Sequence, residues 1–147
     1  MNKRLFFLSV CFLLSMAFLA AQTAEELEAV LDSPAITYSQ AARFVLASVE
    51  NDQIENAFEQ AKERGWIPNV AAEDDPVNMR QLSSLMTNAF GIKGSLMNTI
   101  FPGPRYAYRV MISRSFIQGR ADPNMRVSGE RFLQILGNVL NAAGEEL

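Results

Sequence analysis

A cluster of arginine and tyrosine residues between positions 105 and 126 carries the side chains best suited to binding a ligand. Its members are Arg105, Tyr106, Tyr108, Arg109, Arg114, Arg120 and Arg126. Arg105 and Arg109 are four residues apart, so they would share one face of a helix. Guanidinium groups suit carboxylates and phosphates, and aromatic faces suit sugar rings. The candidate ligand-binding residues are Arg105, Tyr106, Arg109, Arg120 and Arg126.

The residue types needed for common catalytic and metal sites are missing. The chain has no histidine, which excludes histidine-based metal sites and serine–histidine catalysis. The acidic run Glu73-Asp74-Asp75 lacks the ligand spacing and the glycine of a calcium-binding EF-hand loop. Glu130 has no second carboxylate placed for glycan hydrolysis. We therefore expect a non-enzymatic protein without a metal or another cofactor.

The N-terminus has the layout of a secretory signal peptide. A positively charged start, an apolar run over residues 5–19 and two alanines follow one another. The run is shorter than the ~20 apolar residues of a membrane-spanning helix. We expect a signal peptide over residues 1–21, a single domain over residues 22–147, and export to the periplasm or the cell surface. The alternatives are an uncleaved anchor, which would be the only contact with a membrane, and lipidation at Cys11.

Charge is distributed unevenly along the predicted mature chain. That chain has 11 basic and 16 acidic side chains, a net charge of −5. Residues 23–75 hold 12 acids and three bases, whereas residues 76–147 hold four acids and eight bases. The basic half could meet an anionic polymer or partner of the cell envelope. The alternative is that its arginines are solvated or pair with the acidic half. Nucleic acid is not an expected partner, because the exported chain is acidic overall.

Three segments have the periodicity of an amphipathic helix. Apolar or small residues recur at i, i+3, i+4, i+7 and i+8 from Ala41, Leu82 and Phe132. Each segment follows an N-cap signal, and the caps are Thr37, Asn78 and Ser128. An apolar residue precedes each cap, and these residues are Ile36, Val77 and Val127. Gly91 and Gly144 are expected C-terminal stops.

The second and third of these segments belong to a longer repeat. Residues 57–90 and 107–140 align at a constant offset of 50 without a gap. Trp66 matches Phe116 and Phe58 matches Tyr108, so we expect Trp66 and Tyr108 to pack in the core. The alternative for Trp66 is a binding platform. Repeats of this length stack to share one core.

The remaining segments also indicate helices. We expect a short acidic helix that ends near Leu31 and a helix over residues 52–64 ended by Gly65. Pro104 can be the first residue of another helix, and residues 93–100 are expected to form a helical turn or a loop. No segment has the alternation of a convincing strand. The expected fold class is therefore all-α, with repeated helix–loop–helix units packed into one small domain.

The units contain two recurring motifs, a turn and a helix start. The third unit reads Ser115-Phe116-Ile117-Gln118-Gly119, then Val127-Ser128-Gly129-Glu130-Arg131-Phe132. The second reads Arg64-Gly65-Trp66-Ile67-Pro68, then Val77-Asn78-Met79-Arg80-Gln81-Leu82, and the first keeps Ile36-Thr37-Tyr38-Ser39-Gln40-Ala41. Over residues 34–142 this pattern resembles the S-layer homology (SLH) family, whose units carry "GxIxG" and "(I/V)TRxEF". The family has three-fold arrangements of such units that anchor proteins to cell-wall polysaccharide.

The resemblance implies a polysaccharide contact at the arginine of "TRxE". This chain departs from the pattern there, because the corresponding residues are Tyr38, Met79 and Gly129. The expected function is an exported cell-envelope module that binds peptidoglycan or an associated wall polymer. The alternative is a non-enzymatic structural or adaptor subunit of a periplasmic or envelope protein complex.

Overall fold

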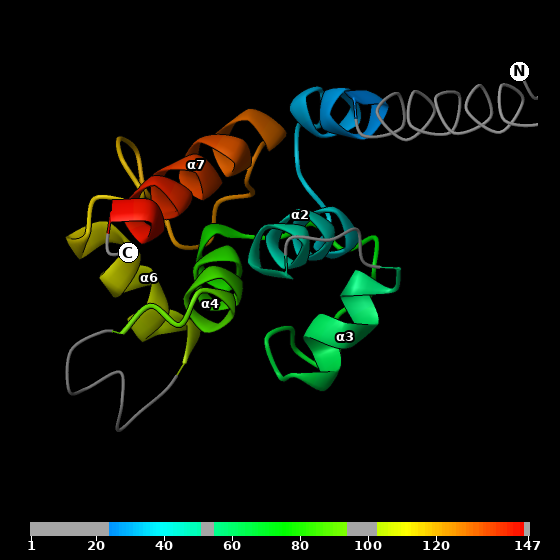
Figure 1. The fold of residues 1–147 in the computed structure, drawn as a ribbon, viewed down its shortest axis with the longest axis horizontal. Coiled ribbons are helices and arrows are strands. Elements are labelled where there is room, and N and C mark those ends of the chain that lie inside the picture. The colour runs from blue at the N-terminus through cyan, green and yellow to red at the C-terminus, as the bar shows by residue number, and fades with distance from the viewer. Residues whose placement is uncertain (1–23, 51–54, 94–102, 146–147) are drawn as a thin grey trace, which may run out of the picture.

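The computed structural model describes residues 24–50, 55–93 and 103–145, which fold into a small all-α domain (Figure 1). Residues 24–31 are helical, as the acidic segment predicted. The other described helices are α2 (Tyr38–Glu50), α3 (Ala57–Glu63), α4 (Met79–Ala89), α6 (Pro104–Ser113) and α7 (Gly129–Glu145). None of the described residues lies in a strand, which confirms that the domain is all-α. The predicted signal peptide and residues 94–100 of the predicted turn lie outside the described residues.

The repeat with an offset of 50 is confirmed in the helix boundaries and in the turns. Helices α3 and α6 end at residues 63 and 113, and α4 and α7 begin at residues 79 and 129. The Trp66 N–H donates to the Ala61 carbonyl, and the Phe116 N–H donates to the Met111 carbonyl, each at 2.9 Å. Gly65 and Ser115 both adopt the left-handed conformation, with φ values of 74° and 61°. The two units therefore repeat their backbone hydrogen bonds as well as their apolar pattern.

Three backbone hydrogen bonds join the units in a closed ring. The Ile36 N–H donates to the Val127 carbonyl at 2.8 Å, and the Val127 N–H donates to the Val77 carbonyl at 3.2 Å. The Val77 N–H closes the ring on the Ile36 carbonyl at 2.9 Å. All three side chains are fully buried. The residues expected just before the three caps thus form the centre of the domain.

Each unit also supplies a carbonyl to the first turn of a neighbouring helix. The Tyr38 N–H of α2 donates to the Asp75 carbonyl at 3.2 Å, and the Met79 N–H of α4 donates to the Met125 carbonyl at 2.9 Å. The Gly129 N–H of α7 donates to the Ser33 carbonyl at 2.9 Å. First-turn N–H groups have no partner inside their own helix. These contacts satisfy three of them and fix the three helices around the ring.

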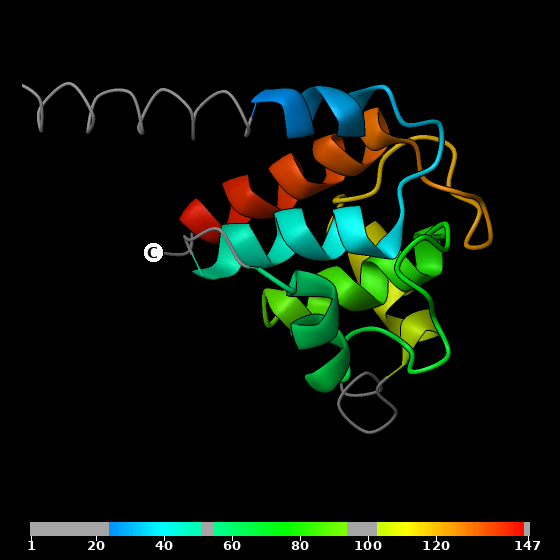
Figure 2. The same ribbon diagram turned by 90° about the vertical axis from the view of Figure 1, so that its right-hand side faces the viewer.

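The third of these contacts brings two backbones unusually close. The helix over residues 24–31 lies beside the N-terminal part of α7 (Figure 2). A Cβ atom on Gly129 would lie 1.5 Å from the Val30 carbonyl oxygen. The Val30 side chain is buried in the core. Only a glycine at position 129 leaves room for this approach.

The helix caps follow the predicted signals. Thr37 and Gln40 form a reciprocal capping box, with hydrogen bonds of 3.0 and 3.3 Å. Asn78 and Gln81 form a second box, with bonds of 2.9 and 3.3 Å. Ser128 accepts a bond of 3.4 Å from the Arg131 N–H. All three predicted N-caps are confirmed.

Three predicted details of the helices are wrong. In the helix expected over residues 52–64, residues 55 and 56 are not helical and α3 begins at Ala57, because Asn56 has φ of 63°; residues 52–54 lie outside the described residues. Gly144 does not end α7, which continues to Glu145. Val49 in the expected α2 stripe is 40% exposed, and Leu46 is buried in its place. The buried face of α2 is rotated because the helix packs against both α3 and α4.

Within the described part of the chain, no helix combines the length and the apolar character needed to cross a membrane.

Candidate functional site

The arginines predicted to share a helix face lie on α6. Gly103 caps this helix and Pro104 is its first residue, as predicted. Ala107, Val110 and Met111 bury one side of α6. Arg105 and Arg109 are exposed, and their spacing places them on the opposite side of the helix. The prediction that Arg105 and Arg109 share one face of a helix is therefore confirmed.

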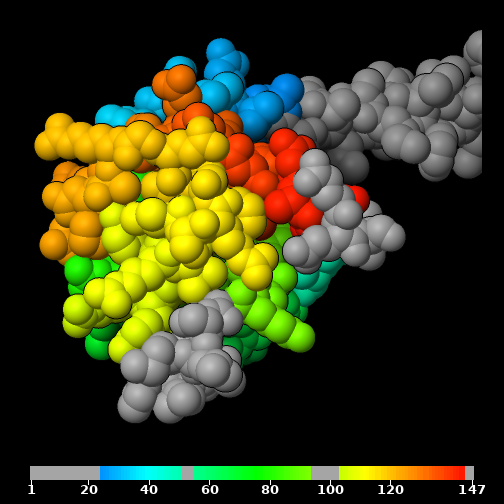
Figure 3. Space-filling model, turned by 90° about the vertical axis from the view of Figure 1, so that its left-hand side faces the viewer, coloured from blue at the N-terminus to red at the C-terminus, as the bar shows by residue number. Residues whose placement is uncertain are grey.

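Side chains of α6 and α7 hydrogen-bond to the loop after α6. The Tyr108 hydroxyl donates to the Ala121 carbonyl at 2.8 Å. The Arg131 guanidinium donates to the Gln118 carbonyl at 2.9 Å and also to the Arg120 carbonyl. Figure 3 shows α6 and this loop forming one continuous surface. Arg120 thus has a fixed backbone and an exposed side chain beside α6.

Tyr108 only partly fulfils its predicted core role. Its ring is partly buried and packs against the core. Its hydroxyl holds the loop, as described above, which is a function that the match with Phe58 could not indicate. Tyr106 lies on α6 and is also partly buried.

The structure places Arg126 in a different environment. Its backbone forms an isolated bridge with Asn78, at the start of α4. The neighbouring Met125 carbonyl accepts the bond from Met79 that fixes the α4 terminus. The Arg126 side chain is exposed there. We therefore define the arginine face as Arg105, Arg109 and Arg120, and assign Arg126 to the surface near the central ring.

In the described part of the chain, the alternative of pairing between the acidic and basic halves is not seen for the arginine face. Among the described residues, one ion pair joins Arg43 to Glu26 at 2.6 Å and the other joins Arg64 to Glu50. Both pairs lie inside the acidic half, so their partners do not come from the arginine face. Arg114, which also belongs to the sequence cluster, donates to the Lys93 carbonyl at 2.9 Å.

The three positions that correspond to the "TRxE" arginine are buried. Tyr38 is 3% exposed, Met79 is fully buried, and Gly129 is covered by the helix over residues 24–31. The Tyr38 hydroxyl is buried and has no hydrogen-bond partner among the described residues. Burial and, to a lesser extent, the negative charge of Asp75 raise the pKa of Tyr38 from 10.0 to about 12. These positions serve packing rather than contact with a polymer in solution.

A pocket lies beside Trp66, for which a binding platform was the alternative to core packing. It has a volume of about 350 Å³ and lies between the turn after α3, the polar face of α4 and the start of α6. Its lining residues include Trp66, Pro68, Gln81, Ser84, Asn88 and Pro104. Trp66 is partly buried, so the core position expected from its match with Phe116 is only partly correct. A usable signal was present, because Gln81, Ser84 and Asn88 recur at i, i+3 and i+7 on α4.

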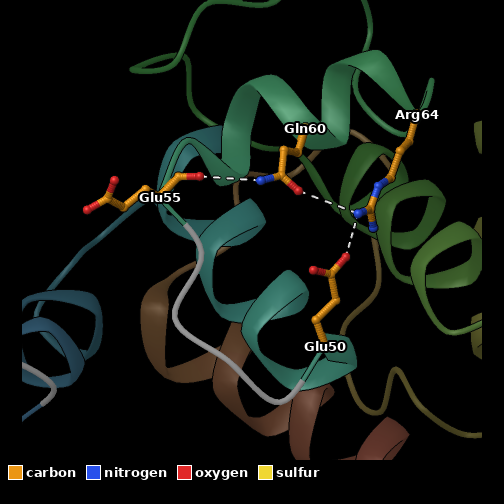
Figure 4. Close-up of polar contacts among 4 residues, drawn as sticks. All are labelled: Glu50, Glu55, Gln60 and Arg64. Carbon is orange, nitrogen blue, oxygen red and sulfur yellow. Dashed lines mark hydrogen bonds and ion pairs between the residues drawn. The ribbon is translucent and has the colours of Figure 1, made fainter.

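Arg64 covers the ring of Trp66. Its guanidinium carbon lies 5.0 Å from the ring centroid, a cation–π contact. The same guanidinium pairs with Glu50 at the end of α2 and contacts the Gln60 side chain at 3.4 Å (Figure 4). Arg64 therefore contacts the Trp66 ring and is itself bonded to residues of α2 and α3.

The described residues contain no group of three or more histidine, cysteine, aspartate or glutamate side chains placed to hold a metal ion. Comparisons with models of protein families, with curated proteins and with solved structures give no match to this chain.

Proposed function

We propose that the protein is an exported cell-envelope module that binds peptidoglycan or an associated anionic wall polymer through the arginine face. The main support is that Arg105, Arg109 and Arg120 are exposed, while the ion pairs of the described residues use other side chains. Their guanidinium groups remain available to carboxylates or phosphates of a polymer. The proposal includes localisation to the periplasm or the cell surface, because the N-terminal sequence has the layout of a secretory signal peptide.

The rigid support behind this face favours binding. Helix α6 is fixed by its buried side, and the loop is fixed by Tyr108 and Arg131. Charged groups on a fixed backbone lose less conformational freedom when a polymer binds. The closed ring of Ile36, Val77 and Val127 is consistent with the three-fold arrangement that the SLH resemblance implies. We therefore propose that the chain is a degenerate member of the SLH family.

A second candidate function is a structural or adaptor subunit of an envelope protein complex. It is favoured by the burial of Tyr38, Met79 and Gly129, which removes the polysaccharide contact that the resemblance implies. In that role the arginine face would meet an acidic surface of a partner protein. We rank it second because burial of these positions does not affect the separate arginine face.

Co-sedimentation of the purified protein with isolated cell-wall sacculi tests the first proposal. We expect saturable pelleting that the double variant Arg105→Ala/Arg109→Ala loses, because two charge-assisted contacts are removed. Arg43→Ala is the matched control, since Arg43 is an exposed arginine on the acidic half. Absence of pelleting at low salt, or equal loss in the control, would contradict polymer binding through this face. Crosslinking in intact cells would then identify the protein partner that the second candidate requires.

A further inference from the structure

We propose that the pocket beside Trp66 binds one uncharged sugar unit of a saccharide. This site is separate from the arginine face and is assigned by its own geometry. It stands whether or not the arginines bind a wall polymer.

The walls of the pocket divide into an apolar and a polar side. Trp66, Pro68, Ile92, Pro104 and Ala107 form the apolar side, together with backbone of Gly65 and Gly103. Gln81, Ser84, Thr87 and Asn88 of α4 form the polar side. None of the described side chains that line the pocket is ionisable. A ligand that fits must therefore be amphipathic and does not need a charge.

The polar side chains suit hydroxyl and amide groups. An amide and a hydroxyl can each donate and accept hydrogen bonds, as sugar hydroxyls also do. Gln81 uses its side-chain oxygen in the capping box, which leaves its NH₂ group as a donor. Asn88 makes a long contact of 3.5 Å to Ser84 at the surface of α4, so a ligand could replace it without breaking a short bond. Phosphate or carboxylate ligands would instead need a cationic side chain in the wall.

The aromatic wall is fixed before any ligand arrives. Arg64 covers the Trp66 ring and is itself held by Glu50 and Gln60. The backbone N–H of Trp66 donates to the Ala61 carbonyl, and the adjacent Ile67 is 2% exposed. A fixed indole offers a flat apolar surface to the C–H face of a sugar ring, with little ordering cost on binding. The pocket volume of about 350 Å³ lies within the range of small-molecule sites.

The third unit differs from the second in how its helix contacts the preceding turn. At an offset of 50, Arg131 takes the place of Gln81, and Asn138 corresponds to Asn88. Asn138 donates from Nδ2 to the Phe116 carbonyl at 3.0 Å, and Arg131 bonds to the carbonyls of the same turn region. In the second unit, Gln81 and Asn88 bond instead within α4 and its cap. Among the described residues, the polar side chains of α4 thus make no hydrogen bond to the turn after α3, whereas their counterparts on α7 bond to the turn after α6.

Fluorescence titration can test this site, because Trp66 is the only tryptophan of the chain. The probe is the disaccharide of N-acetylglucosamine, which offers both hydroxyl and amide groups without charge. We expect a saturable change in Trp66 emission that is unaffected by raising the salt concentration, because no charge pair is involved. We also expect the Arg105→Ala/Arg109→Ala variant to bind the disaccharide like the parent protein.

Substitutions on α4 separate binding in the pocket from a general effect on the fluorescence. Asn88→Ala and Ser84→Ala should each weaken binding by about tenfold, which corresponds to one lost hydrogen bond of ~1.4 kcal/mol. Asn141→Ala on α7 is the control, since Asn141 is exposed and lies outside the pocket lining. Circular dichroism checks that each variant is folded. The proposal is overturned if Trp66 emission shows no saturable change up to about 10 mM disaccharide, because a dissociation constant above that concentration is too weak for a specific site. It is also overturned by binding that survives both α4 substitutions in folded protein.

Discussion

The close approach of Gly129 to Val30 leads to a prediction in which a normally favourable substitution becomes harmful. In an exposed helix, replacing glycine with alanine stabilises the helix by roughly 1 kcal/mol. At position 129 the new Cβ would lie 1.5 Å from the Val30 carbonyl oxygen. An ordinary contact needs about 3.5 Å, so one of the two backbones must move by roughly 2 Å.

The size of the effect follows from the contacts that such a movement breaks. It would disrupt the 2.9 Å bond from the Gly129 N–H to the Ser33 carbonyl and strain the neighbouring bond from Ile36 to Val127. Each backbone bond contributes about 1 kcal/mol, and partial exposure of buried Val30 costs a further 1–2 kcal/mol or so. After subtracting the roughly 1 kcal/mol gained from alanine, we expect Gly129→Ala to lower the free energy of unfolding by about 2 kcal/mol.

Gly137→Ala supplies the matched control on the same helix. A Cβ on Gly137 would meet no atom within 4 Å, so only the helical gain remains. We expect this variant to be more stable than the parent by up to about 1 kcal/mol. Urea unfolding monitored by circular dichroism measures both variants on one scale. Equal stability of the two variants would refute the reasoning, because it would show that the helix over residues 24–31 does not cover Gly129.

Three further predictions concern single side chains. Tyr38→Phe should preserve or slightly raise stability at neutral pH, because it removes a buried hydroxyl without a described partner. Folding raises the pKa of the Tyr38 hydroxyl from 10.0 to about 12, so the unfolded protein ionises first and the free energy of unfolding falls as pH rises from 10 through 12. Unfolding scans should therefore show less alkaline destabilisation for the variant. Ser115→Gly should stabilise the fold by about 1 kcal/mol in chemical denaturation, because φ is 61° there and the matching residue is Gly65. Asn78→Ala should cost about 1 kcal/mol in the same assay, because it removes the capping box of α4.

Local signals allowed the helices and their order to be predicted from the sequence. The caps at Thr37 and Asn78 were correct because a capping box depends on residues only three positions apart. The offset of 50 was visible because matching turns need matching apolar residues in the core. The interruption at Asn56 was not visible, because its left-handed conformation is not specified by a recognisable turn motif.

The features missed from the sequence depend on distant parts of the chain. Gly129 reads as an unremarkable helix start, and its role appears only when the helix over residues 24–31 lies against it. Arg126 is close in sequence to Arg120, but the hydrogen bond from the Met79 N–H to the Met125 carbonyl places its backbone beside the central ring. Trp66 matches a buried phenylalanine, yet its surroundings differ because Gln81 and Asn88 do not bridge to the turn as their counterparts do.

The salt dependence of binding to cell-wall sacculi tests the central claim most directly. If the arginine face contacts an anionic polymer, the affinity should fall steeply as the salt concentration rises, because added ions screen exposed charge pairs. The Arg105→Ala/Arg109→Ala variant should bind more weakly at low salt and depend less on salt, whereas Arg43→Ala should behave like the parent protein. A variant that keeps the parent's affinity and salt dependence would contradict binding through the arginine face.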